Sequence, residues 1–223
     1  MTLDNLIWPI ASLISVVAGI TIHEFSHAFS AELLGDPTPR YNGRLTLNPL
    51  AHLDPLGGIM ILMSALSGLG FGWGKPVPVN PVNLRFGPRV GLAITAFAGP
   101  FSNLVLATLA AAPIRIALVL GSPLPYTLSV ILALVALVNI SLAVFNMLPL
   151  FPLDGFSVLR GLLSLIRANW AYQVGSFLDR FQAYGPIILL LLIGSGWIFR
   201  GTSLLGLILS PLTNLLSRVI IGF

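Results

Sequence analysis

Residues 6–30 read LIWPIASLISVVAGITIHEFSHAFS, and this stretch decides the fold. A helix needs about 20 mostly apolar residues to cross the hydrocarbon core of a bilayer. This stretch is long enough, and its only ionisable groups, His23, Glu24 and His27, lie near one end. No basic segment precedes it, so we expect a membrane helix that stays in the mature protein rather than a cleaved signal peptide.

Three further apolar blocks follow: Val90 to Ala112, Tyr126 to Leu148 and the shorter Tyr184 to Phe199. The last is framed by Tyr184 and by Trp197 and Arg200, residue types that anchor helices at the membrane interface. Of the 223 residues, 56% are hydrophobic and only 8% are charged, which excludes an ordinary soluble domain. The sequence therefore predicts an all-α polytopic membrane protein of about four to six transmembrane helices.

Charge and cysteine content exclude other classes. The net charge is +4, but the basic residues are scattered between apolar blocks, so we expect the lipid bilayer and no nucleic acid as partner. The absence of cysteine excludes disulfides, thiolate catalysis and cysteine-bound zinc. Without a polar module, residues 1–223 are expected to form one domain, with a core over about 6–165 and C-terminal helices over about 182–223.

The chain between the first two spans is rich in turn formers. Within it, Gly57 to Gly72 is apolar but short, and we interpret it as re-entrant rather than spanning. Arg44 to Leu47 alternates polar and apolar residues, which predicts a short strand. After Gly201, polar residues recur at spacings of three to four, which predicts an amphipathic helix that lies in the interface or closes the bundle.

The segment His23-Glu24-Phe25-Ser26-His27 matches HExxH. On a helix, positions i and i+4 share a face, so both imidazoles can bind one metal ion, with Glu24 beside its open position. Ionisable groups in a membrane helix are costly, and three at ligand spacing favour a metal site over a satisfied polar cluster.

The third ligand must come from elsewhere. Position 33 is leucine, which excludes the HExxH form extended by a third histidine, and Glu32, the only other glutamate, points away around the same helix. Five residues remain as candidates for the third ligand: Asp36, His52, Asp54, Asp154 and Asp179. Asp154 stands out because Pro149, Pro152 and Gly155 break the helix there, and irregular backbone at membrane depth usually lines a polar site.

Topology supports this pairing. If Gly57 to Gly72 does not cross, the first span ends, the second begins and the third ends on one side, which brings HExxH and Asp154 together. Most arginines and lysines fall on that side, which the positive-inside rule makes cytoplasmic.

Several blocks of the sequence resemble the site-2 proteases, the intramembrane zinc metalloproteases of peptidase family M50. The resemblance rests on HExxH and on Leu153-Asp154-Gly155, together with Gly99 to Asn103, which match a GxxxN motif. It implies one zinc ion held by His23, His27 and Asp154, with Glu24 as the catalytic base. It also implies a small form without PDZ or CBS domains, a location in a prokaryotic cell membrane and membrane-protein substrates with a transmembrane helix, cleaved in or near it.

The chemistry of such a site leaves further roles open. Asn103 and Asn146 are candidates for an oxyanion donor or a substrate-positioning group, although both types of side chain also serve as hydrogen-bond partners between helices. We further hypothesise that the predicted strand, Arg44 to Leu47, pairs with an extended substrate. An ion-handling transporter and a catalytically inactive scaffold are the rival functions, and the substrate, its trigger and the oligomeric state stay open.

Overall fold

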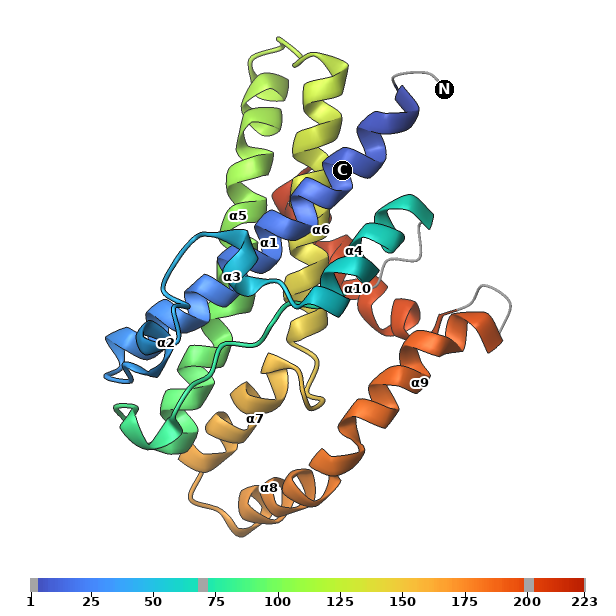
Figure 1. Cartoon of the computed structure of the whole chain (residues 1–223). Helices are drawn as coiled ribbons and strands as arrows, with labels where there is room; N and C mark the ends of the chain where they lie inside the picture. Colours follow the sequence, from blue (N-terminus) through green and yellow to red (C-terminus); the bar gives the residue numbers. More distant parts are fainter. Residues whose placement is uncertain (1–3, 68–71, 199–202, 223) are drawn as a thin grey trace.

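The computed structural model describes residues 4–67, 72–198 and 203–222, and the part of the chain that it describes is helical apart from turns and extended loops (Figure 1). The helices, in chain order, are α1 (Asp4–Leu33), α2 (Thr38–Tyr41), α3 (Pro49–His52), α4 (Pro55–Ser67), η1 (Pro81–Asn83), α5 (Pro88–Val119), α6 (Tyr126–Asn146), α7 (Asp154–Leu165), α8 (Asn169–Phe181), η2 (Gln182–Tyr184), α9 (Gly185–Ile198) and α10 (Leu204–Ile220). Four stretches are long and apolar enough to cross a membrane: Trp8–Leu33, Pro88–Val119, Tyr126–Asn146 and Asn169–Gly196. The chain is therefore an integral membrane protein, and the prediction of an all-α polytopic fold is confirmed.

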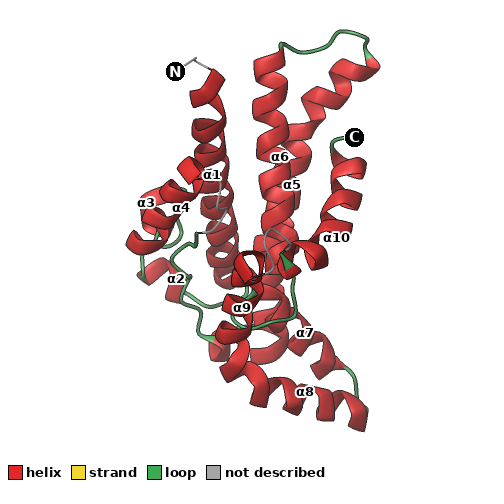
Figure 2. Cartoon of the chain, turned by 90° about the vertical axis from the view of Figure 1, so that its right-hand side faces the viewer, coloured by secondary structure: helices red, strands yellow, loops and turns green. Residues whose placement is uncertain are grey.

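Three long helices, α1, α5 and α6, form the centre of the bundle (Figures 1 and 2). The buried face of α5 consists mostly of small residues at spacings of three or four, including Gly91, Thr95, Gly99 and Ala107. Apolar side chains gain little by leaving lipid for protein, so membrane helices associate through close backbone packing, which small residues permit. This stripe lets α1 and α6 approach α5 closely enough for polar side chains to meet between them.

The predicted strand at Arg44 to Leu47 is wrong, because these residues form an irregular loop between α2 and α3. Gly43 has a φ of 67° and starts the loop after a one-turn helix. Arg44 is buried, and its guanidinium donates to the carbonyl oxygens of Ala51 (2.5 Å), Lys75 (3.1 Å) and Pro76 (3.2 Å). The alternation of polar and apolar residues therefore does not reflect a strand. It reflects the buried Arg44 side chain, which binds backbone carbonyl oxygens of other segments.

The region interpreted as re-entrant contains α4, a helix of 13 residues. At about 1.5 Å per residue it is about 20 Å long, too short to cross a core of about 30 Å. An isolated antiparallel bridge joins Leu53 to Gly74, and the Lys75 N–H donates to the His52 carbonyl oxygen over 2.7 Å. The two ends of the segment that contains α4 therefore lie side by side, which a re-entrant segment requires. Residues 68–71 lie outside the described part.

The C-terminal amphipathic helix is α10, and it closes the bundle. It lies beside α5 and α6 in Figure 2, and Ile221, the residue that follows it, is fully buried in a core with Ala107, Ala136 and Ile140. The expected anchors Trp197 and Arg200 have side chains outside the described part of the chain.

Candidate metal centre

His23 and His27 lie one turn apart on α1, and both are buried. Their ring centroids are 4.6 Å apart, with the ring planes perpendicular. Both rings face α5 at Gly99. A Cβ atom at position 99 would lie 2.5 Å from His27 Cε1 and 2.7 Å from His23 Cε1, so only glycine leaves room for the two imidazoles.

Asp154 reaches the same point from the other end of the sequence, as the first residue of α7. The turn between α6 and α7 folds back so tightly that a Cβ at Gly155 would collide with the Met147 carbonyl oxygen. This turn directs the carboxylate toward α1, where Asp154 Oδ2 is 3.1 Å from His23 Nε2 and Oδ1 is 3.4 Å from His27 Nε2. In the described part of the chain, this is the only group of three or more His, Asp and Glu side chains close enough to share a metal ion.

The far nitrogen of each imidazole faces a hydrogen-bond acceptor. His23 Nδ1 is 2.6 Å from Asn103 Oδ1, and His27 Nδ1 is 2.7 Å from the Thr95 carbonyl oxygen. The orientation of Asn103 is fixed because its Nδ2 donates to Gly19 O (3.0 Å) and to Asn139 Oδ1 (2.8 Å). Each Nδ1 therefore carries a hydrogen, and in the neutral imidazole this leaves Nε2 as a bare acceptor.

Two bare nitrogens therefore face a carboxylate. Lone pairs on both sides repel each other, and charging both neighbouring imidazoles inside membrane helices would be costly. Asp154 Oδ2 is buried and accepts no hydrogen bond from the described residues. A divalent cation held between the three side chains would remove the repulsion between the lone pairs and give Asp154 Oδ2 a partner. The donor set therefore fits a metal ion.

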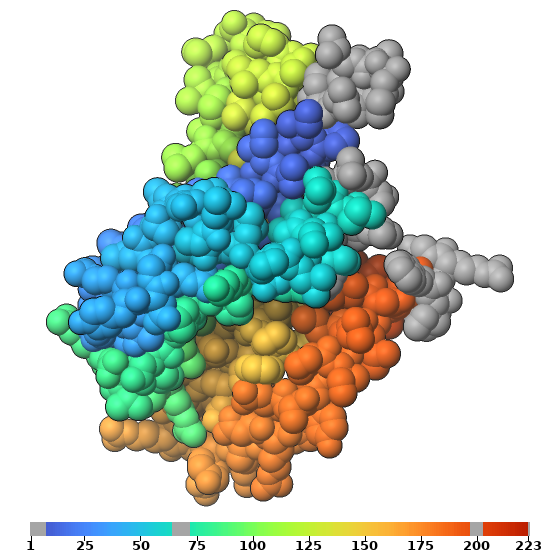
Figure 3. All heavy atoms as spheres, in the orientation of Figure 1, coloured from blue at the N-terminus to red at the C-terminus, as the bar shows by residue number. Residues whose placement is uncertain are grey.

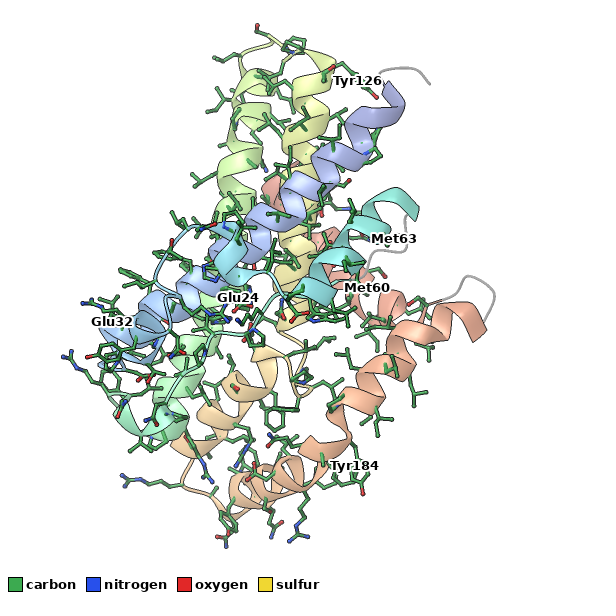
Figure 4. The ribbon with its side chains drawn as sticks, viewed as in Figure 1. Glu24, Glu32, Met60, Met63, Tyr126 and Tyr184 are labelled. Carbon is green, nitrogen blue, oxygen red and sulfur yellow. The ribbon has the colours of Figure 1, made fainter. Side chains whose placement is uncertain are left out.

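Glu24 lies beside this cluster. Its Oε2 accepts a hydrogen bond of 3.2 Å from the backbone N–H of Val77, in an extended segment, residues 74–80, that we call the strap. Glu32, on the same helix, lies at the outer edge of the molecule in Figure 4 and pairs with Arg40 at 2.7 Å, as its position around the helix predicted. Of the two glutamates, Glu24 alone is placed for chemistry at the centre.

The other candidates for third ligand are engaged elsewhere. Asp36 is fully buried and accepts hydrogen bonds from Thr38, Asn80 and Asn83. His52 Nε2 is 2.7 Å from the Thr46 carbonyl oxygen. Asp54 accepts from the first N–H groups of α4, and Asp179 pairs with Arg160 at 2.5 Å.

Asn103 is fully buried behind His23, and both hydrogens of its amide are used by Gly19 and Asn139. It has no hydrogen left for an oxyanion. Asn146 is half-buried two turns beyond Asn139 on α6, and one donor bonds the Leu142 carbonyl oxygen over 2.9 Å. The sequence did not point to Thr95 and Val77, because both contact the site through backbone atoms. For Thr95 a signal was present, since its spacing of four from Gly99, and that of Gly99 from Asn103, places all three residues on one face of a helix.

Similarity to known proteins identifies the family of this chain. The sequence model of the protein family "Peptidase family M50" matches residues 109–179, which include Asp154. The protein named "Putative zinc metalloprotease YwhC" of Bacillus subtilis is 35% identical over 189 residues, covering 81% of this chain and 78% of the relative. The chain belongs to peptidase family M50.

A second M50 relative is "Putative zinc metalloprotease Rip2" of Mycobacterium tuberculosis, 33% identical over 152 residues that cover 66% of this chain and 56% of the relative. The Rip2 protein of Mycolicibacterium smegmatis matches over the same shares at 33% identity. No solved structure matches this M50 peptidase. The family resemblance found in the sequence is thus confirmed.

Proposed function

We propose that this M50 peptidase is an intramembrane zinc endopeptidase that hydrolyses peptide bonds in or near transmembrane segments of membrane proteins. One zinc ion per chain would be held by His23, His27 and Asp154. The observation that carries this proposal is the meeting of two imidazole Nε2 atoms and a carboxylate within 4.8 Å of one another between membrane helices.

The spacing of the donors supports zinc. Ligands bound tetrahedrally at about 2.0–2.2 Å lie about 3.3–3.6 Å apart, near the 3.1 and 3.4 Å separations of Asp154 from His23 and His27. Each imidazole also has an acceptor at Nδ1, the outer-shell contact that zinc-binding histidines ordinarily make. Three protein ligands with a free fourth position are typical of catalytic rather than structural zinc.

When bound, zinc acts as a Lewis acid that lowers the pKa of water to about 7 and polarises the scissile carbonyl. Glu24 takes the proton from the attacking water and can pass it to the leaving amine. The Val77 N–H holds its carboxylate in place. Asn103 orients His23, and we keep Asn146 as the candidate that contacts the substrate or the oxyanion.

The position of the site among membrane helices favours membrane proteins as the class of substrate. The three side chains lie between α1, α5 and the start of α7, and α1 and α5 are both long and apolar enough to cross a membrane, so a membrane-embedded peptide would reach the site more directly than a soluble one. With α1 ending, α5 beginning and α6 ending at one end of the bundle (Figure 1), the basic residues of that end favour a cytoplasmic location of the active site.

The test uses the full chain purified in detergent, with zinc content and cleavage of single-span peptides as readouts. Glu24→Gln should keep zinc and lose at least about a hundredfold in turnover, because removal of a general base costs about 10²–10⁴. Asn103→Leu, in the same panel, should instead lower zinc affinity by about 10–100-fold.

Glu32→Gln is the matched control, with the same chemical change on the same helix, and should leave turnover nearly unchanged. Full cleavage by Glu24→Gln would overturn the role of Glu24 as the base. Zinc binding by the wild-type chain without cleavage of any peptide would favour a transporter, which has no use for a base.

A further inference from the structure

A polar cavity lies away from the metal centre, at the end of the bundle where α5 begins. Its volume is about 180 Å³. The polar side chains that line it come from α5, α7 and α8: Arg89, Arg160, Ser164, Tyr172, Ser176 and Asp179. At the lower end of Figure 3, the green start of α5, the gold α7 and the orange α8 come together.

Arg160 is the central group of this cavity. Its side chain is only 13% exposed and lies so close to Gly175 that a Cβ there would collide with the guanidinium. The Nη2 atom bonds Asp179 Oδ2 at 2.5 Å. A guanidinium has five N–H donors, and this is its only hydrogen bond to the described residues, so a largely covered cation keeps most of its donors free.

Arg89 adds a second positive charge. No carboxylate pairs with it among the residues that the structure describes, and it stands at the N-terminal end of the 32-residue α5, where the helix dipole favours anions. The cavity therefore holds two arginines against one aspartate. The hydroxyl groups of Ser164 and Ser176 already donate to Gly161 O and Gln173 O, so the free donors are mainly those of the guanidinium groups. This donor set matches an anion with several oxygen atoms, because guanidinium groups bind phosphate with paired hydrogen bonds.

Helix α8, which lines the cavity, has an apolar side and a polar side. In Figures 1 and 2, α8 runs across the end of the bundle while α5 and α6 stand along its axis. The apolar side of α8 exposes Trp170 (54%), Phe177 (55%) and Phe181 (47%). Exposed aromatic residues on an amphipathic helix are typical of the membrane interface.

We propose that this cavity binds the phosphate of an anionic phospholipid headgroup, with Arg160 and Arg89 as the charged donors. The acyl chains would lie along the exposed apolar residues of α8. This end of the bundle is the one that carries most of the basic residues, and the cytoplasmic leaflet is the one rich in anionic lipid. The binding site is separate from the zinc site and does not depend on proteolysis.

Native mass spectrometry of the full chain in detergent tests this, with phosphatidylglycerol and phosphatidylcholine added in equal amounts. We expect selective retention of phosphatidylglycerol. Arg89→Gln and Arg160→Gln should each lower that retention by about tenfold, because a charge-assisted contact to phosphate is lost. Asp179→Asn removes the competing carboxylate from Arg160, so retention should stay equal or rise.

Arg180→Gln is the matched control, since it removes the same charge from α8 outside the cavity, and retention should change by less than about twofold. Equal losses in Arg180→Gln and Arg89→Gln would mean unspecific attraction and would overturn the site. So would equal losses in Arg160→Gln and Asp179→Asn, because these indicate only a structural ion pair.

Inorganic phosphate distinguishes the source of the phosphate. If it displaces phosphatidylglycerol and raises the melting temperature without lipid, the cavity recognises the phosphate group itself. If phosphatidylglycerol binds and inorganic phosphate does not compete, the acyl chains contribute as proposed. Failure of both ligands to bind would refute the proposal.

Discussion

Gly99 determines how closely α5 approaches the two imidazoles. Its missing side chain leaves the space in which His23 and His27 lie, since an added Cβ would be 2.6 Å from His27 Nε2. We predict that Gly99→Ala abolishes zinc binding and turnover while the helix persists, because alanine favours helices. Zinc content and circular dichroism measure the two effects.

The control is Gly194→Ala in α9, where a Cβ would meet nothing within 4 Å. It should leave zinc and turnover unchanged. Normal zinc content in Gly99→Ala would mean that the two rings do not need the space at α5.

Asp36 joins the end of α1 to η1. Its fully buried carboxylate accepts from Thr38 Oγ1 (2.6 Å), Asn80 N (2.7 Å) and Asn83 Nδ2 (2.9 Å). Burial raises the pKa of this carboxyl, but the hydrogen bonds outweigh burial and hold the pKa below its ordinary value. The stabilisation is therefore present above the ordinary pKa of about 3.9 and is lost as the pH falls through the lower folded-state pKa.

We predict that Asp36→Asn lowers stability at pH 7 by about 1–3 kcal/mol, since at least one buried donor loses its acceptor. Thermal unfolding at pH 7 and below about pH 4 should show the gap between wild type and variant shrinking in acid. Asp54→Asn is the control with little effect, because one oxygen of Asp54 accepts from both Leu56 N and Gly57 N and the asparagine oxygen can do the same. A gap that stays constant with pH would contradict the role of the ionised carboxylate.

At the scale of elements, the strap connects the segment that contains α4 to η1 and contacts Glu24 through Val77. Arg44 holds two of its carbonyl oxygens, and Asp36 accepts from the N–H of its last residue, Asn80. The strap is thus fixed at both ends, with the Val77 N–H between them on Glu24. This arrangement positions Glu24, the proposed base, through the backbone N–H of Val77.

We predict that Val77→Pro, which removes that N–H, lowers turnover by about 10–100-fold with zinc content unchanged, because small displacements of a catalytic group are costly. Val79→Pro is the control, since its N–H makes no hydrogen bond to the described residues. Faster turnover in Val77→Pro would mean that the strap restrains Glu24 rather than positions it.

At the scale of the whole molecule, sidedness follows from the three central helices. The chain has no cysteine, so single cysteines report topology directly. We predict that Ser122→Cys, in the loop between α5 and α6, reacts with an impermeant maleimide in intact cells. Val82→Cys, 80% exposed at the other end, should react only after lysis. The opposite labelling would place the metal centre on the outer side.

The sequence by itself determined the membrane class, the spans of α1, α5 and α6, and the pair His23 and His27 with Glu24. These follow from hydrophobic length and from helical spacing, which are local properties of the chain. HExxH needs only one helix to bring its side chains together. Among the candidates for the third ligand, the break in the helix favoured Asp154. Its position beside the two histidines was inferred only from the topology of the spans.

Only the tertiary structure decided what surrounds the site. Arg44 turned out to hold the strap instead of belonging to a strand, since four alternating residues do not distinguish these cases. Asn103 lies behind His23, and Val77 reaches Glu24 across 53 positions of sequence. Such contacts join backbone groups and side chains of distant segments, and no local periodicity encodes them, because they exist only once the helices have packed.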